Sequence, residues 1–286
     1  MNYITQLNQV INYIEEHITE KISYDELAKI VCCSTYHFQR MFAFMNDVPL
    51  SEYIRRRRMS LAAVDLQNGK KIIEVAFKYQ YASPTAFSRA FQNIHGILPS
   101  EVKKEGAKLK SYPPLSFTLT IRGADELTYR VEEKDAFRII GYSKNLDREM
   151  ENNFKTVPDF WDSAVENGIV SELLDLNNCE PHELLGITAC GNRKIWKYYI
   201  AVSSSLPLNK KYEEYIIPAS MWAVFSGEGT NITLQDLERR VVTEWLPFSG
   251  YDYGDAPDIE RYFLADPQHA KYEFWLSIKN RQGVSA

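Results

Sequence analysis

The sequence lacks the features that mark metal-binding, membrane and secreted proteins. Its four cysteines, Cys32, Cys33, Cys179 and Cys190, form no CxxC pair, and the five histidines are scattered without the spacing of metal ligands. No run approaches the roughly 18 apolar residues of a membrane span. The N-terminal stretch is polar and periodic, without the basic start and apolar block of a signal peptide. We therefore expect a cytoplasmic protein with no metal, no cofactor and no membrane partner.

The net charge of −5 is unevenly distributed along the 286 residues. Residues 1–110 carry +4, whereas residues 111–286 carry −9. A mildly basic segment suits contacts with phosphates, while an acidic segment is repelled by DNA. The chain is long enough for two domains. We place their boundary between residues 110 and 111, just before the helix-breaking pair Pro113-Pro114.

A short pattern occurs twice in the first 110 residues. Each copy combines a short helix, a tight turn and a second helix, which is the layout of a helix-turn-helix. The second helices share a Phe-x-Arg-x-Phe pattern at a constant offset, namely Phe38, Arg40 and Phe42 in the first copy and Phe87, Arg89 and Phe91 in the second. Two such units on one support can place two reading helices in successive major grooves. The repeat therefore predicts an all-α DNA-binding domain.

The polar side chains of these second helices are the candidate DNA-reading residues. In the first copy we expect Tyr36, Gln39 and Arg40 to project outward. Arginine can pair with guanine and glutamine with adenine, and a tyrosine can contact a thymine methyl or a phosphate. The matching positions of the second copy hold Thr85, Ser88 and Arg89. A solvated polar face would explain one such helix, but its repetition favours DNA reading.

A long helix predicted over Leu50–Leu66 joins the two units. It contains the run Arg55-Arg56-Arg57-Arg58. Four consecutive helical residues span all faces of the helix, so they cannot all contact one DNA molecule. We expect one or two of these arginines to bind phosphates and the others to form ion pairs.

The rear part of the chain alternates strand and helix patterns. After two initial strands, two successive strand-helix-strand-strand sets predict an α+β domain with pseudo-twofold symmetry. A cleft between two such halves is a natural ligand site. The strands are expected at Leu115–Ile121, Thr128–Glu133, Phe137–Tyr142, Leu184–Cys190, Trp196–Val202, Met221–Ser226, Ile259–Leu264 and Lys271–Ile278, and the helices at Phe154–Asn167 and Leu234–Leu246.

Residues 1–108 resemble the DNA-binding domain of the AraC/XylS family of bacterial transcription regulators. The stretch Tyr53–Met59 is similar to the linker helix of that family. Phe87–Phe91, followed by His95-Gly96 and Pro99–Glu101, is similar to the signature near the end of the domain. The resemblance implies that the chain binds double-stranded promoter DNA and that RNA polymerase is a partner.

The run from Ser34 to Phe42 resembles the Rob/MarA branch of that family, whose reading helix has an aromatic residue, a Gln and an Arg at the positions of Tyr36, Gln39 and Arg40. This similarity implies base readout by those three residues. Two positions depart from the pattern. Asp47 stands where a turn glycine is usual, and Pro84-Thr85 replaces a pair of glutamines that is common in this branch. The second reading helix is therefore expected to have a different base preference.

Residues 126–280 resemble the GyrI-like domain that binds small molecules and serves as the effector-binding part of Rob-type and BmrR-type regulators. The similarity rests on Tyr129–Glu132, Phe137–Gly141, Tyr198–Val202 and Tyr272–Leu276. It implies that Glu273 lies in the effector pocket; from the strand pattern alone, a solvated position is the alternative. Strand alternation places Trp275 on the same side as Glu273. Further pocket candidates, for which a core position is the alternative, are Trp222, Tyr198 and Trp161.

The sequence thus favours a transcription regulator, not an enzyme, with a rear domain that binds a hydrophobic or aromatic effector, either neutral or cationic. Two alternatives remain open for that domain. It could be a GyrI-like hydrolase with Glu273 as a base, or a module whose acidic surface binds a protein. The sequence contains no second carboxylate partner, nucleophile motif or cofactor loop that would support the hydrolase. Both a monomer and a dimer are compatible with two reading helices in one chain.

Overall fold

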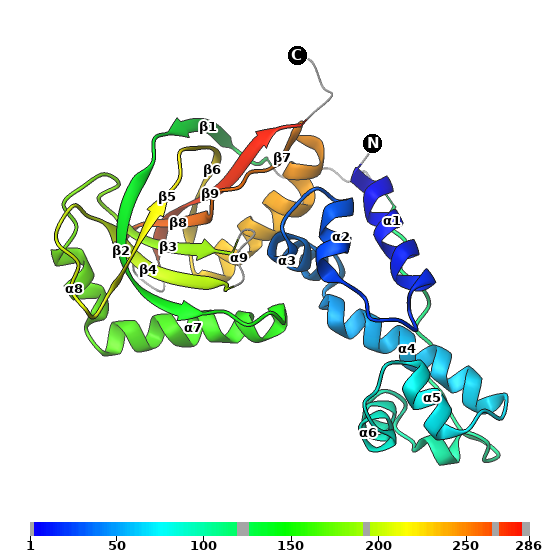
Figure 1. Cartoon of the computed structure of the whole chain (residues 1–286). Helices are drawn as coiled ribbons and strands as arrows, with labels where there is room; N and C mark the ends of the chain where they lie inside the picture. The colour runs from blue at the N-terminus through cyan, green and yellow to red at the C-terminus, as the bar shows by residue number, and fades with distance from the viewer. Residues whose placement is uncertain (1–2, 119–125, 191–194, 265–268, 282–286) are drawn as a thin grey trace. The chain divides into compact units, whose positions relative to one another are not determined.

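The computed structural model describes residues 3–118, 126–190, 195–264 and 269–281 (Figure 1). The chain divides into two compact units. The helical unit comprises Met1–Val31 and Val48–Ile121, and the sheet unit comprises Cys32–Asp47 and Arg122–Ala286. No helix in the described parts of the chain is long and apolar enough to cross a bilayer.

The helical unit contains five α-helices and a short 3-10 helix among its described residues. These are α1 (Tyr3–Glu16), α2 (Tyr24–Ile30), α4 (Leu50–Gln67), α5 (Ile72–Lys78), α6 (Pro84–His95) and η1 (Pro99–Glu101). Serine side chains start two of them: Ser23 caps α2 and Ser83 caps α6 by accepting hydrogen bonds from backbone N–H groups. Gly96 ends α6 in the left-handed conformation that a glycine adopts readily. The predicted helix-turn-helix of the second copy therefore forms as α5 and α6.

The four consecutive arginines of α4 all bind groups inside the helical unit. Arg57 forms a buried ion pair with Glu15 of α1, at 2.5 Å. Arg58 donates to the backbone carbonyls of Ile18 and Glu20. Arg55 and Arg56 pair with a glutamate one turn earlier on the same helix. The run thus fixes α4 against its neighbours, and the phosphate contacts expected from it stay a prediction.

The helical unit extends past the boundary expected at residue 110. The backbone N–H of Tyr112 donates to the Ser60 hydroxyl of α4. The side-chain amide of Asn8 in α1 both accepts from the N–H and donates to the carbonyl of Phe117. These bonds hold the segment against α1 and α4. Residues 115–118 consequently form no strand, and the rest of the strand expected at Leu115–Ile121 lies outside the described residues.

The sheet unit is built on one antiparallel sheet with the strand order β1-β6-β9-β8-β3-β4-β2-β5, and β7 pairs with β9 beside this path. The order is symmetric about the β8–β3 pair, because β6, β9 and β8 on one side correspond to β2, β4 and β3 on the other. The expected pseudo-twofold repeat is therefore present. The strands are β1 (Tyr129–Lys134), β2 (Phe137–Asn145), β3 (Leu184–Ala189), β4 (Lys197–Ser203), β5 (Glu213–Ile217), β6 (Ser220–Gly229), β7 (Tyr251–Tyr253), β8 (Asp258–Leu264) and β9 (Ala270–Asn280).

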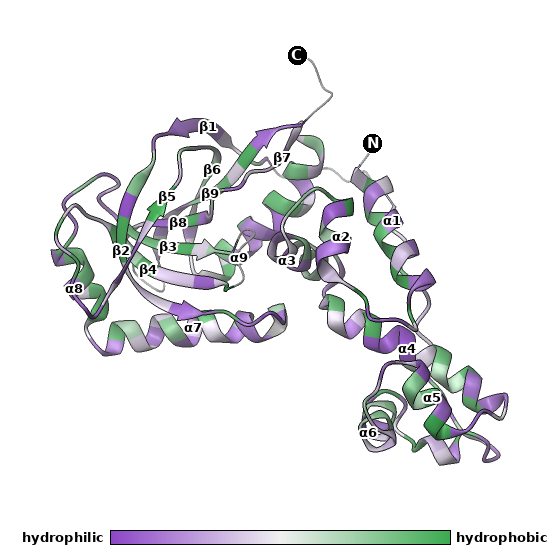
Figure 2. Ribbon diagram, viewed as in Figure 1, coloured by the Kyte–Doolittle hydropathy of each residue, from purple (hydrophilic) through white to green (hydrophobic). Residues whose placement is uncertain are grey.

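The helices of the repeat lie on one face of this sheet. Helix α7 (Met150–Glu166) is amphipathic, with hydrophobic and hydrophilic residues in alternation (Figure 2). It packs with α8 (Ile169–Asp175) on one half of the sheet, and α9 (Asn231–Arg240) with η2 (Val241–Trp245) and η3 (Leu246–Phe248) covers the other half. A separate core of strand residues fills the opposite face. The short elements α8, β5 and β7 were not expected from the sequence.

Helix α3 (Thr35–Asn46) belongs to the sheet unit. It starts at Ser34, whose hydroxyl accepts from the N–H of His37, and ends at Asp47 in the left-handed conformation. The sequence predicted α3 as the reading helix of the first helix-turn-helix within residues 1–110. Instead, α2 and α3 fall in different compact units, because the polar face of α3 is bonded to side chains of the sheet unit.

Candidate functional site

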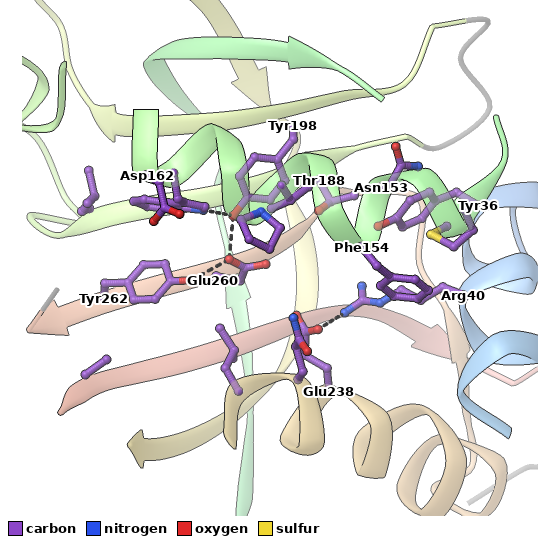
Figure 3. A pocket seen from close by; sticks show the side chains of 18 of the residues that line it. Tyr36, Arg40, Asn153, Phe154, Asp162, Thr188, Tyr198, Glu238, Glu260 and Tyr262 are labelled. Atoms are coloured by element: carbon purple, nitrogen blue, oxygen red, sulfur yellow. Dashed lines mark hydrogen bonds and ion pairs between the residues drawn. The ribbon is translucent and has the colours of Figure 1, made fainter. Parts of the chain in front are cut away.

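A cavity of about 200 Å³ lies over the central strands of the sheet unit (Figure 3). Residues from α7, α9 and α3 form its sides, and residues from β3, β4 and β8 line its floor. The lining is mostly aromatic and aliphatic. Its aromatic members are Tyr36, Phe44, Phe154, Trp161, Tyr198 and Tyr262, and its charged members are Arg40, Asp162, Glu238 and Glu260.

Glu260 of β8 is the carboxylate at the centre of this aromatic lining. Its Oε2 atom accepts hydrogen bonds from the hydroxyls of Tyr198 and Tyr262, each at 2.7 Å. The indole Nε1 of Trp161 in turn donates to the Tyr198 hydroxyl at 2.8 Å. Burial raises the pKa of both tyrosines well above the usual value, and the charge of Glu260 adds to the shift, so both remain hydrogen-bond donors at neutral pH.

No lysine or arginine of the described chain forms an ion pair with Glu260, which leaves its charge without an internal counter-ion. The strand backbone leaves room for this carboxylate. Gly186 of β3 faces it, and a Cβ at that position would collide with the Tyr198 hydroxyl and with the Glu260 carboxylate. A larger residue there would displace both groups.

A buried carboxylate, that of Glu238 in α9, lines the same cavity and pairs with an arginine of α3. Arg40 forms an ion pair with Glu238 at 2.5 Å and with Asp258 at 3.1 Å. The guanidinium also lies over the rings of Phe44 and Phe274. Burial and, to a lesser extent, the charge of Glu260 raise the pKa of Glu238 to about 7, against the opposing attraction of Arg40.

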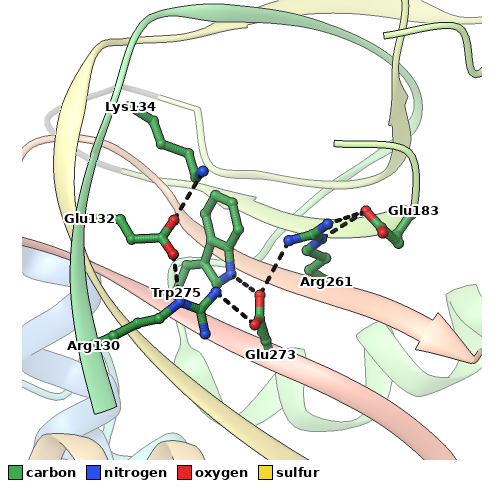
Figure 4. Close-up of polar contacts among 7 residues, drawn as sticks. All are labelled: Arg130, Glu132, Lys134, Glu183, Arg261, Glu273 and Trp275. Atoms are coloured by element: carbon green, nitrogen blue, oxygen red, sulfur yellow. Dashed lines mark hydrogen bonds and ion pairs between the residues drawn. The ribbon is translucent and has the colours of Figure 1, made fainter. Parts of the chain in front are cut away.

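Glu273, the effector residue expected from the resemblance, does not line this cavity. It lies in a network of charges on the opposite face of the sheet (Figure 4). Arg130 contacts it at 2.7 Å and Arg261 at 3.4 Å, while Trp275 Nε1 donates to it at 2.9 Å. The solvated alternative is wrong for Glu273, because it is only 5% exposed and pairs with two arginines. Its role in effector binding stays a prediction.

The tryptophan and tyrosine candidates divide between the two faces. Tyr198 and Trp161 line the cavity, and their role in effector binding stays a prediction. Trp222 and Trp275 are buried in the core of the opposite face, with ring centroids 6.1 Å apart, and do not line it. Trp222 and Trp275 are therefore core residues of the sheet unit.

The outward orientation predicted for the reading residues of α3 is wrong in this structure. Tyr36, Gln39 and Arg40 are buried, at 7%, 4% and 6% exposure. Tyr36 packs edge-on against the ring of Trp196, and Arg40 forms the ion pairs described above. Their DNA-reading role stays a prediction, as does the separation of the two reading helices.

Helix α6 presents its candidate residues differently. Thr85 and Arg89 are exposed, whereas Ser88 is half-buried and donates its hydroxyl to the carbonyl of Pro84 at 2.8 Å. Phe87 and Phe91 lie in the core of the helical unit, as the amphipathic pattern predicts. Two of the three polar candidates of the second copy are thus accessible to DNA.

The residues missed at the sequence level are Glu260, Tyr262, Glu238 and Asp258. The sequence could have indicated Glu260 and Tyr262, because they lie two residues apart on a predicted strand and so on the same side of it, as Glu273 and Trp275 do. Which of the two pairs faces the cavity depends on pairing between strands. In that pairing Arg261 lies opposite Glu273, so a cation of the neighbouring strand neutralises Glu273.

The fold and the cavity define a DNA-binding regulator with an attached ligand-sensing domain. A helix-turn-helix domain model matches residues 27–105, and the model of the integron-associated effector binding protein matches residues 130–278. The chain belongs to this effector-binding family and carries an AraC-type DNA-binding domain, which makes it a transcription regulator of the AraC type with a GyrI-like effector-binding domain.

Known proteins are similar to the whole chain or to one of its domains. The transcriptional regulator Rob of Salmonella typhimurium is 24% identical over 294 residues, covering 96% of this chain and 98% of its own length. The regulatory protein SoxS of the same organism is 35% identical over 104 residues, covering 36% of this chain and 97% of its own length. The solved structure of SAV2435 bound to tetraphenylphosphonium covers 54% of this chain and 94% of its own, with 19% identity and a TM-score of 0.47.

Proposed function

We propose that this regulator binds a lipophilic aromatic cation in the cavity around Glu260, and that the bound ligand alters its binding of promoter DNA and its recruitment of RNA polymerase. The observation that carries the proposal is a carboxylate set among aromatic rings that forms no ion pair with any described lysine or arginine. A ligand changes DNA binding only if it prefers one conformation of the protein over another.

The charge and shape of the cavity support a cation over an anion. Its lining holds three carboxylates and one guanidinium, and that guanidinium is already paired with Glu238. A cation in contact with Glu260 would gain Coulomb attraction in a partly dehydrated site, and the rings of Trp161, Tyr198 and Tyr262 would add cation–π attraction. An anion of the same shape would be repelled by Glu260.

Replacing Glu260 by glutamine tests this assignment. We expect Glu260→Gln to lower the affinity for tetraphenylphosphonium by about tenfold or more, since one full charge interaction is lost while the amide keeps the shape. Isothermal titration calorimetry on the full chain measures the affinity. Tetraphenylborate has the same shape and the opposite charge, and should bind weakly to the wild type.

Glu273→Gln is the control, because Glu273 is also a strand glutamate of the sheet unit but does not line the cavity. It should leave the affinity for tetraphenylphosphonium unchanged. If Glu273→Gln abolishes binding while Glu260→Gln does not, the ligand site is on the other face of the sheet. If neither the cation nor the anion binds the wild type, the proposed ligand class is wrong.

We further propose that the cavity binds its ligand without transforming it. The similarity to the transcriptional regulator Rob over nearly the whole chain supports a sensing role. The central carboxylate of the cavity, Glu260, is bonded to the hydroxyls of Tyr198 and Tyr262. A cationic ester whose aromatic group fits the cavity should be recovered intact after prolonged incubation with the protein, as measured by mass spectrometry. Turnover above the buffer rate would favour the hydrolase alternative.

A further inference from the structure

The side of the cavity formed by α3 contains residues that the sequence assigns to DNA reading. Tyr36 and Arg40 line the cavity (Figure 3), and so does Phe44. The same Arg40 is the residue expected to pair with a guanine. One guanidinium cannot occupy the interior of the sheet unit and a DNA groove at the same time, so the buried state of α3 and its reading state exclude each other.

The buried state depends on a balance of charges. Arg40 is the one arginine or lysine of the described chain within ion-pair distance of Glu238 or Asp258. His37 contacts the same Asp258 oxygen at 3.3 Å, and its ring stacks on Tyr253. Removing a buried carboxylate from water is costly unless a cation accompanies it. The α3 helix therefore supplies the charge that keeps ionised Glu238 stable inside the sheet unit.

A cationic ligand would compete for that role. Glu238 and Glu260 line one cavity and their charges interact. A cation placed among the rings between α7 and α9 would neutralise Glu238 as well as Glu260, and its bulk would contact the sides formed by Tyr36 and Phe44. Both effects weaken the ion pair and the packing that bind α3 to the rest of the sheet unit.

We propose that Arg40 acts as an internal counter-ion that an aromatic cation displaces, so that ligand binding releases the DNA-reading face of α3. This inference rests on the proposed ligand class and adds the regulation of the same site. Without ligand, the pair of Arg40 with Glu238 and Asp258 withholds Tyr36, Gln39 and Arg40 from DNA. With ligand, the three side chains become free to read bases.

The first test measures DNA binding by the full chain. A duplex is selected from a random pool with the wild-type protein in the presence of tetraphenylphosphonium, and its affinity is followed by fluorescence anisotropy. The cation should raise the affinity by about tenfold, within the usual range of allosteric coupling. Glu238→Gln should have the raised affinity without the cation and gain little when the cation is added, because Arg40 has lost its main partner.

Glu244→Gln is the control for a nearby charge change, since Glu244 pairs with Arg240 on the same helical segment and does not line the cavity. It should behave as the wild type. The proposal is overturned if Glu238→Gln binds DNA as weakly as the wild type without the cation, or if the cation strengthens DNA binding of both proteins equally.

A second test needs no DNA. Replacing Arg40 by methionine removes the competing cation, so Arg40→Met should bind tetraphenylphosphonium about tenfold more tightly than the wild type by calorimetry. Hydrogen–deuterium exchange of the unmodified chain should also show faster exchange over residues 35–46 when the cation is present. The exchange measurement uses the wild-type chain, so it remains informative even if Arg40→Met folds poorly.

The outcomes separate the two proposals. If tetraphenylphosphonium binds the wild type in a Glu260-dependent way, but Arg40→Met has unchanged affinity and exchange over α3 is unchanged or slower, the ligand site stands and the displacement of Arg40 is refuted. If the cation does not bind the wild type at all, the ligand class itself is refuted and the displacement falls with it.

Discussion

At the scale of single residues, the function of a carboxylate in this protein depends on which partners the tertiary structure supplies. Glu273 and Glu260 occur in similar strand contexts, yet Glu273 pairs with two arginines, whereas the described side chains that bond to Glu260 are tyrosine hydroxyls. The charge of Glu273 is therefore neutralised within the protein, and Glu260 is the carboxylate that we propose binds a cationic ligand. Glu238 is a third case, in which burial and a single arginine oppose each other.

Glu238 leads to a prediction about pH. Its pKa of about 7 in the folded chain exceeds the ordinary value of 4.5, so the folded chain binds this proton more tightly than the unfolded chain does. Stability contributed by this group is therefore fully present below pH 4.5 and is lost as the pH rises to 7. The free energy of unfolding of the wild type, relative to Glu238→Gln, should fall by about 3 kcal/mol across that window.

Chemical denaturation of both proteins at several pH values measures this difference. A relative stability that rises with pH would mean that the attraction of Arg40 outweighs burial. A difference that does not vary with pH would mean that Glu238 does not titrate in this window.

At the scale of elements, two helices with the same sequence pattern have different surroundings. Both α3 and α6 carry Phe-x-Arg-x-Phe and begin at a serine cap. Helix α6 buries its phenylalanines in the helical unit and exposes Thr85 and Arg89. Helix α3 buries its polar face as well, because the sheet unit offers carboxylates to Arg40. Amphipathic spacing predicted both helices, but exposure of the polar face depended on a distant part of the chain.

The exposed side of α6 makes Arg89 the accessible candidate for base contact. We expect Arg89→Ala to weaken binding to a selected duplex by about 1–3 kcal/mol and to relax the preference at one base position. Anisotropy titrations against the selected duplex and single-base variants measure both effects. Lys144→Ala removes one exposed charge of the sheet unit and should change neither. An unchanged specificity ratio in Arg89→Ala would exclude base reading by this residue.

At the scale of the whole molecule, the proposed regulator couples two binding events through one helix. The ligand cavity and the candidate DNA-reading face share the residues Tyr36 and Arg40. Such sharing requires no long pathway between sites, because one side chain has two alternative partners. The size of the coupling is limited by the difference between the ligand affinities of the two states.

Thermodynamic linkage gives a prediction at this scale. If tetraphenylphosphonium raises the affinity for DNA by some factor, saturating DNA must raise the affinity for tetraphenylphosphonium by the same factor. With the expected coupling of about tenfold, both titrations should shift by about 1.4 kcal/mol. Calorimetry with and without the selected duplex gives the second factor. Unequal factors would show that a further equilibrium, such as self-association, contributes.

The sequence by itself determined the repeated helix pattern, the α+β repeat and the family, because periodicity, caps and strand alternation are local properties of the chain. It also identified Tyr198 and Trp161 as pocket residues. The tertiary structure decided which glutamate faces the cavity and where the polar face of α3 lies. Both depend on charges brought together from distant positions: Arg261 lies opposite Glu273 through strand pairing, and Glu238 meets Arg40 through packing. The free energy of a buried charge depends on its nearest partners in space, and no local pattern in the sequence specifies them.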